Sequence, residues 1–87
     1  MVLTGIFIYK GFKPGCEIDG KLEGIILLQL GAGTLKVMGY HHQIRGLREG
    51  DYIRCTVTCD NYGYIYLESA KLDADQTLLN RIVNESE

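Results

Sequence analysis

The residues best suited to ligand chemistry are tyrosines near the end of the chain. The sequence holds six tyrosines in 87 residues. Tyr52, Tyr64 and Tyr66 occupy alternating positions of two predicted strands, so we expect all three on the outer side of one hairpin, together with Arg54. Aromatic rings stack on nucleobases and a guanidinium binds phosphate. Cross-strand pairing of the same rings would also simply stabilise the hairpin. The set therefore predicts either a nucleic-acid platform or a reinforced hairpin.

A second candidate region is the polar, basic stretch 40–48, Tyr-His-His-Gln-Ile-Arg-Gly-Leu-Arg. With Lys10, Lys13 and Lys36 it could form the basic rim of a groove, although scattered basic residues also occur on any solvated surface. A handful of phosphate contacts would give weak, strongly salt-dependent binding. The candidate nucleic-acid-binding residues are Lys36, Tyr40, His42, Arg45, Tyr52, Arg54, Tyr64 and Tyr66. The pattern does not separate DNA from RNA.

The charge balance offers no general attraction to nucleic acid. The formal net charge is −2, and residues 1–72 hold eight Lys and Arg against seven Asp and Glu, which gives +1. Residues 73–87 hold one Arg against four Asp and Glu, which gives −3. The predicted body is balanced and the tail is acidic, so any attraction to phosphate has to be local.

A metal site, a cofactor site and a catalytic centre are not expected. Cys55 and Cys59 lie four residues apart on a predicted strand, about 13 Å, which is too far to share a zinc ion. No Cys-x-x-Cys motif, phosphate loop, dinucleotide fingerprint or nucleophile elbow occurs. His41 and His42 have no identifiable partner for acid–base chemistry. The sequence therefore predicts a binding module, not an enzyme.

The cysteine count predicts a reducing compartment. Three cysteines cannot all pair within one chain, and the N-terminus lacks the pattern of a signal peptide. The longest apolar run, Ile25–Leu28, is too short to span a bilayer. We expect free thiols and a cytoplasmic protein with no membrane association.

Composition and periodicity predict five strands that would position these residues. The expected strands are Val2–Lys10, Leu22–Leu30, Thr34–Tyr40, Asp51–Cys59 and Tyr64–Lys71. Residues 11–21 are expected as a loop, 41–50 as a connector with one helical turn, and Asp60–Gly63 as a tight turn. The alternation is strictest in 51–59, where Ile53, Cys55, Val57 and Cys59 should face inward.

These elements predict an all-β domain, a five-stranded antiparallel Greek-key barrel of the OB type over residues 1–72. An SH3-like barrel has a similar strand count and is the alternative. Residues 73–87 are expected to form a C-terminal helix. Its apolar stripe, which would pack on the barrel or mediate association, consists of Leu78, Leu79, Ile82 and Val83.

The second strand is apolar on both sides, which predicts an uncovered surface. If Ile26, Leu28 and Leu30 fill the barrel, Ile25 and Leu27 point outward. The C-terminal helix or a second copy of the chain would have to cover them. A protein–protein interaction or homo-oligomeric subunit, such as a dimer, with no nucleic-acid role is therefore the alternative function.

Residues 47–57 and 60–67 read as Gly-Asp, alternating strand, Asp-x-x-Gly, alternating strand. This pattern resembles the last two strands of small RNA-binding OB domains, including the repeat modules of the largest small-subunit ribosomal protein and the smallest bacterial initiation factor. The resemblance implies an OB barrel and, by analogy of fold, single-stranded nucleic-acid binding. Those families have aromatic-rich second and third strands, whereas here the third strand has only Lys36 and Tyr40.

Overall fold

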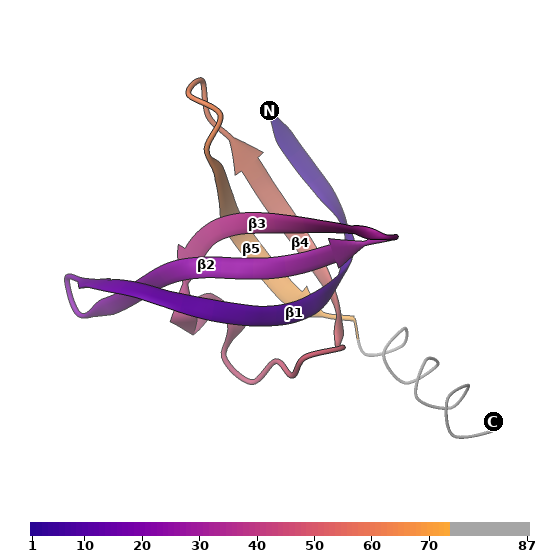
Figure 1. The fold of residues 1–87 in the computed structure, drawn as a ribbon, viewed down its shortest axis with the longest axis horizontal. Helices are drawn as coiled ribbons and strands as arrows, with labels where there is room; N and C mark the ends of the chain where they lie inside the picture. The colour runs from indigo at the N-terminus through magenta and orange to yellow at the C-terminus, as the bar shows by residue number, and fades with distance from the viewer. Residues whose placement is uncertain (74–87) are drawn as a thin grey trace.

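The computed structural model describes residues 1–73, which form one closed, five-stranded β-barrel. The strands are β1 (Val2–Ile18), β2 (Lys21–Leu30), β3 (Gly33–Tyr40), β4 (Tyr52–Cys59) and β5 (Ile65–Leu72), and a short 3₁₀ helix, η1 (His41–Ile44), follows β3 (Figure 1). The five predicted strands and the single helical turn in the connector are confirmed. The small barrel is consistent with both OB-like and SH3-like domains.

The barrel is mixed, and the expectation of a purely antiparallel barrel was wrong. The strands follow each other around the barrel in the order β1-β2-β3-β5-β4, and the last strand pairs with the first. Every pairing is antiparallel except that of β3 with β5, which are parallel and meet at Met38 and Tyr66. The connector carries the chain away from β3 to β4, and β5 returns beside β3 in the same direction.

The predicted loop at residues 11–21 is in fact mostly strand. β1 continues to Ile18 and forms a long hairpin with β2, which extends beyond the barrel (Figure 1). Two register shifts, between Tyr9 and Gly11 and between Pro14 and Glu17, mark bulges in β1, and Gly11 and Pro14 are the paired residues beside them. Proline is also tolerated here because this part of β1 pairs with β2 alone.

The interior of the barrel follows the predicted alternation. Ile53, Cys55 and Val57 of β4 are buried, whereas Arg54 between them is exposed. The buried hydrophobic core consists of Phe7, Tyr9, Ile26, Leu28, Val37, Ile44, Ile53, Cys55, Val57 and Leu67. Leu30 does not fill the barrel as expected. It is 60% exposed because it is the last residue of β2 before the turn to β3.

The predicted C-terminal helix lies outside the described residues, as do Leu78, Leu79, Ile82 and Val83. Asp73 is the last described residue, and its backbone N–H donates to the Tyr52 carbonyl at 2.8 Å. Within residues 1–73, no helix has the length and hydropathy that crossing a membrane requires.

Candidate functional site

A row of side chains crosses the outer face of four strands. The strand register places Lys13 of β1 opposite Ile25 of β2, Ile25 opposite Met38 of β3, and Met38 opposite Tyr66 of β5. Lys13 is exposed, Met38 is half-buried, and Ile25 and Tyr66 are each 39% exposed. The barrel thus presents a cation, an aliphatic side chain, a thioether and an aromatic ring in one line.

Neighbouring rows widen this face on both sides. Leu27 pairs with Lys36 on one side of the row, and Glu23 pairs with Tyr40 on the other. Side chains alternate along a strand, so Lys36, Met38 and Tyr40 share the outer side of β3. We call the set Lys13, Glu23, Ile25, Leu27, Lys36, Met38, Tyr40 and Tyr66 the outer face.

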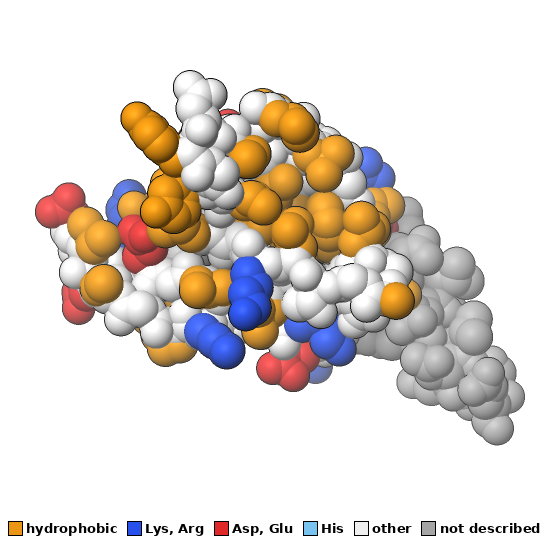
Figure 2. Space-filling view, turned by 45° about the horizontal axis from the view of Figure 1, so that its top comes forward, with side chains coloured by type: hydrophobic (Ala, Val, Ile, Leu, Met, Phe, Trp, Pro, Cys, Tyr) orange, Lys and Arg blue, Asp and Glu red, His pale blue; other side chains and the backbone are white. Residues whose placement is uncertain are grey.

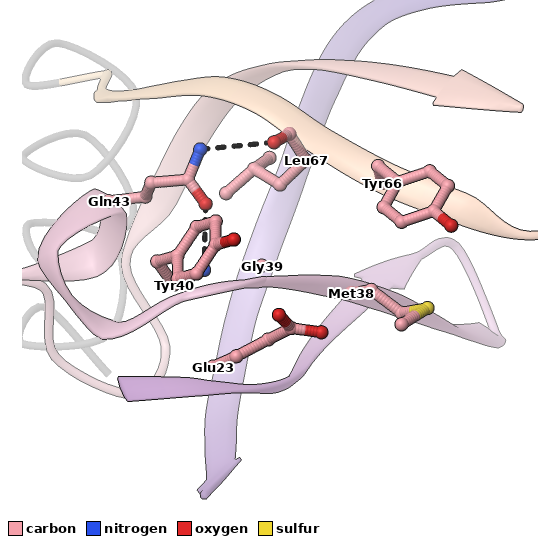
Figure 3. Close-up of a pocket in the computed structure, with 7 residues that line it drawn as sticks. All are labelled: Glu23, Met38, Gly39, Tyr40, Gln43, Tyr66 and Leu67. Atoms are coloured by element: carbon pink, nitrogen blue, oxygen red, sulfur yellow. Dashed lines mark hydrogen bonds between the residues drawn. The ribbon is translucent and has the colours of Figure 1, made fainter. Parts of the chain in front are cut away.

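A hollow opens in the outer face where β3 and β5 meet. It is lined by Glu23, Met38, Gly39, Tyr40, Gln43, Tyr66 and Leu67 (Figure 3). Gly39 is buried at its base, where an added Cβ would lie 2.6 Å from Ile26 Cδ1 and 2.9 Å from Gln43 Oε1. Only glycine lets β3 approach the core this closely, and this approach brings the two outward neighbours of Gly39, Met38 and Tyr40, to the rim of the hollow.

Tyr66 is positioned by the turn between β4 and β5. The Asp60 carboxylate accepts hydrogen bonds from the backbone N–H groups of Tyr62 at 2.8 Å and Tyr64 at 3.0 Å, which confirms the predicted tight turn. The pKa of Tyr66 is raised, first by partial burial and then by the Asp60 carboxylate, which hydrogen-bonds the phenol. The more distant Tyr64 and Glu23 also raise it. The phenol therefore stays neutral at physiological pH, and its ring faces the hollow from β5.

Tyr40 has two cationic or titratable neighbours. Its ring stacks on His42 with centroids 5.6 Å apart and an interplanar angle of 22°. Lys21 Nζ lies 5.9 Å from the centre of the same ring, within the range of a cation–π interaction. The structure therefore brings Tyr40 and His42 together as candidate residues and adds Lys21, which the sequence analysis did not single out.

The predicted tyrosine platform is divided between two ends of the last hairpin. Tyr66 of β5 pairs with Thr58 of β4. Tyr52 lies six residues before Thr58 on β4 and pairs with Ile8 of β1. Six residues of strand span about 20 Å. Arg54 is near the Tyr52 end, where its guanidinium lies 3.9 Å from the Asp73 carboxylate. Tyr52 and Arg54 therefore do not share a surface with Tyr66.

The remaining predicted residues fall at different distances from the outer face. Tyr64 is 56% exposed and precedes β5, two residues from Tyr66. Arg45 is exposed directly after η1. Lys36, Tyr40, His42 and Tyr66, with Tyr64 beside them, are the predicted residues that the structure gathers.

The sequence analysis was incomplete for three residues in or beside the outer face. Lys13 was named as a possible rim residue but was placed in a loop, Met38 was not considered as an outward residue, and Asp60 was assigned only to the turn and not to Tyr66. The alternation of Lys36, Met38 and Tyr40 was a usable signal for Met38. The position of Lys13 in β1, opposite Ile25, had no such signal, because it depends on the pairing of β1 with β2.

A second surface is the open end of the barrel opposite η1. Two adjoining hollows there, of about 210 and 310 Å³, share Leu3 and Leu35. Their lining, which we call the apolar mouth, consists of Met1, Leu3, Phe7, Leu30, Gly33, Thr34, Leu35, Val57, Cys59 and Ile65. Met1 is 89% exposed and Leu3 is 51% exposed. Figure 2 shows hydrophobic side chains running almost continuously across this end, with Lys and Arg side chains below them.

Comparison of the chain with protein-family models, with curated proteins and with solved structures finds no match. In residues 1–73, no group of three or more His, Cys, Asp and Glu side chains is arranged to hold a metal ion. The protein is a small closed β-barrel with one mixed polar and aromatic face and one apolar end.

Proposed function

We propose that the chain is an OB-type barrel that binds single-stranded nucleic acid, DNA or RNA, across its outer face. Three features support the OB assignment over an SH3-like one. β3 runs parallel to β5, β1 pairs with both β2 and β4, and the connector between β3 and β4 contains a helical turn. OB barrels bind oligonucleotides on the face of the second and third strands, between the β1–β2 and β4–β5 loops. The outer face occupies that position.

The observation that carries the proposal is the row Lys13–Ile25–Met38–Tyr66, with Tyr40 and Lys36 beside it. Flat or flexible apolar groups at its centre suit nucleobases, and each base stacked on an aromatic ring contributes about 1–3 kcal/mol. Lys13, Lys21 and Lys36 lie around these groups and suit the phosphates. Three phosphate contacts to a single strand give a slope of log K against log salt of about −2.

The test is fluorescence anisotropy with labelled oligo-dT and oligo-U at about 50 and 200 mM salt. We expect saturable binding that weakens with salt. Tyr66→Ala should weaken it by about fivefold or more because a stacking ring is removed, while Tyr66→Phe should stay within about twofold because the ring remains. The matched control is Tyr52→Ala, on the same strand pair but at the other end.

Two results would reject this placement. Absence of binding to both oligonucleotides at the lower salt concentration would reject nucleic-acid binding altogether. Loss of binding in Tyr52→Ala or Arg54→Ala, with Tyr66→Ala unaffected and all three variants folded, would move the site to the opposite end of the hairpin.

The apolar mouth supports a second candidate function, a homo-oligomeric subunit with no nucleic-acid role. Within residues 1–73 the side chains lining the mouth carry no charge, so they suit an apolar partner surface. A second copy of the chain supplies one, because a two-fold contact places the same patch on both sides. Interfaces of permanent homodimers resemble a divided hydrophobic core.

Sedimentation equilibrium tests this candidate. We expect a dimer that Leu30→Glu converts to a monomer, because this exposed side chain would bring a charge into the interface without entering the core. The control is Leu72→Glu. Leu72 is also exposed, but it lies at the end of β5 that is remote from the apolar mouth. A monomeric wild-type chain at about 100 µM, a concentration at which interfaces of standard size associate, would reject the candidate.

A further inference from the structure

Glu23 occupies an unusual place for a carboxylate on a face that is to bind a polyanion. It is the outward residue of β2 opposite Tyr40, and it is half-buried. Its carboxylate points into the hollow between the Tyr40 ring on one side and Met38 and Tyr66 on the other (Figure 3). Within residues 1–73 it forms no ion pair and accepts no hydrogen bond. Its full capacity as an acceptor therefore faces the hollow.

Two other polar side chains around the hollow are already engaged. The Gln43 side chain accepts from the Tyr40 N–H at 2.8 Å and donates to the Leu67 carbonyl at 3.0 Å. The Asp60 carboxylate holds the β4–β5 turn and the Tyr66 phenol. An incoming group therefore meets two aromatic rings, a thioether, the Tyr40 hydroxyl and one open carboxylate, which is an acceptor only.

The open Glu23 carboxylate excludes the phosphate backbone from the hollow and selects among the bases that could enter it. A carboxylate repels phosphate, so the backbone must run toward the lysines while a base enters the hollow. Guanine presents two adjacent donors, N1–H and the N2 amino group, which match the two oxygens of a carboxylate. Adenine and cytosine present one amino donor beside a ring acceptor. Uracil and thymine present one N–H between two carbonyls. In each case a carboxylate gains one hydrogen bond at most and is repelled by the neighbouring acceptor.

We propose, on the basis of the proposed function, that Glu23 makes this hollow a guanine-selective subsite of the outer face. The base stacks on the Tyr66 ring beside Tyr40, and its Watson–Crick edge donates both hydrogen bonds to the Glu23 carboxylate. Bidentate recognition of a base edge discriminates strongly against bases that lack the matching donors. The remaining nucleotides of the strand are held through stacking and phosphate contacts with no sequence preference.

The experiment compares labelled oligo-dT strands that contain one central guanine, hypoxanthine, adenine, cytosine or thymine. We expect guanine to bind about five- to tenfold more tightly than thymine. Hypoxanthine should be intermediate, because it keeps N1–H and lacks the N2 amino group. Glu23→Gln keeps the side-chain size but replaces one acceptor oxygen with a donor, so it should bring the guanine and thymine strands within about twofold of each other.

Glu17→Gln is the matched control, because Glu17 is an exposed carboxylate on the same β1–β2 hairpin but does not line the hollow. It should keep the guanine preference. Equal binding of all five strands by the wild-type protein would overturn the subsite and leave the proposed function standing. Absence of binding to every strand would overturn both. A guanine preference that survives Glu23→Gln would overturn the role of Glu23.

Discussion

The Gln43 side-chain amide donates to the backbone carbonyl of Leu67 at 3.0 Å, although the two residues lie 24 positions apart. The oxygen of the same amide accepts from the backbone N–H of Tyr40 at 2.8 Å. One side chain thus links η1, the end of β3 and the middle of β5. Because β3 and β5 meet at only one residue pair, this amide reinforces the closure of the barrel beside the hollow.

Replacement of Gln43 by alanine should therefore destabilise the fold. We expect a loss of about 1–3 kcal/mol in the free energy of unfolding, because a backbone donor and a backbone carbonyl lose their partner in a partly buried site. Urea denaturation measures this. The control is Gln29→Ala, whose amide donates to the Gly31 carbonyl at an exposed turn. Equal losses in the two variants would contradict the closure role of Gln43.

Gly39→Ala should be destabilising by about 1–3 kcal/mol, for a steric reason. The new methyl group would lie 2.6 Å from Ile26 Cδ1 and 3.3 Å from Leu67 Cβ, in the packed core. Gly33→Ala on the same strand is the control, because its Cβ would meet only the Leu30 carbonyl oxygen at 3.6 Å. Thermal unfolding of both variants should show a lower midpoint for Gly39→Ala alone, and an unchanged midpoint would contradict the close approach.

Local patterns were sufficient to predict the elements that depend on neighbouring residues. The alternation in 51–59 predicted which side of β4 is buried, and Asp60 with Gly63 predicted the turn. The hairpin at 11–21 was missed because glycines and a proline indicate a loop when strand pairing is unknown. The register shifts beside Gly11 and Pro14 exist only in the paired structure.

Relations between distant strands could not be predicted in the same way. The parallel contact of Met38 with Tyr66 results from the path of the connector, which no local pattern specifies. For the same reason Tyr52 and Tyr66 were expected together. Their alternation correctly predicts a shared side, but only the register with Ile8 and Thr58 shows that they occupy opposite ends. The types of residue in the candidate site could thus be predicted from the sequence, but which of them lie together could not.

Burial raises the pKa of the Cys55 thiol from 9.0 to about 11, because a thiolate would lie in the apolar core. The unfolded chain ionises first as the pH rises, so this contribution to stability is complete below pH 9 and is lost between pH 9 and 11. We expect the free energy of unfolding to fall by about 1 kcal/mol more from pH 7 to pH 10 in the wild-type protein than in Cys55→Val. Urea titrations at both pH values measure the difference. Identical pH dependence of the two proteins would show that Cys55 does not titrate in this way.

The last prediction concerns the lysines of the outer face. If Lys36 and Lys13 contact phosphates, Lys36→Gln and Lys13→Gln should each weaken binding to oligo-dT and oligo-U alike, and each should reduce the slope of log K against log salt by about 0.7. Lys71→Gln is the control for charge, because Lys71 is an exposed lysine that pairs with Arg54 near the far end of the hairpin. Its slope should match that of the wild-type protein.

The comparison of slopes separates local contact from general electrostatics. Each variant changes the net charge by the same amount, so a nonspecific attraction would lower the slope equally in all three. A phosphate path along the outer face lowers it only for Lys36→Gln and Lys13→Gln. If Lys71→Gln reduced the slope as much as these two variants, the backbone could not be following the row from Lys13 to Tyr66.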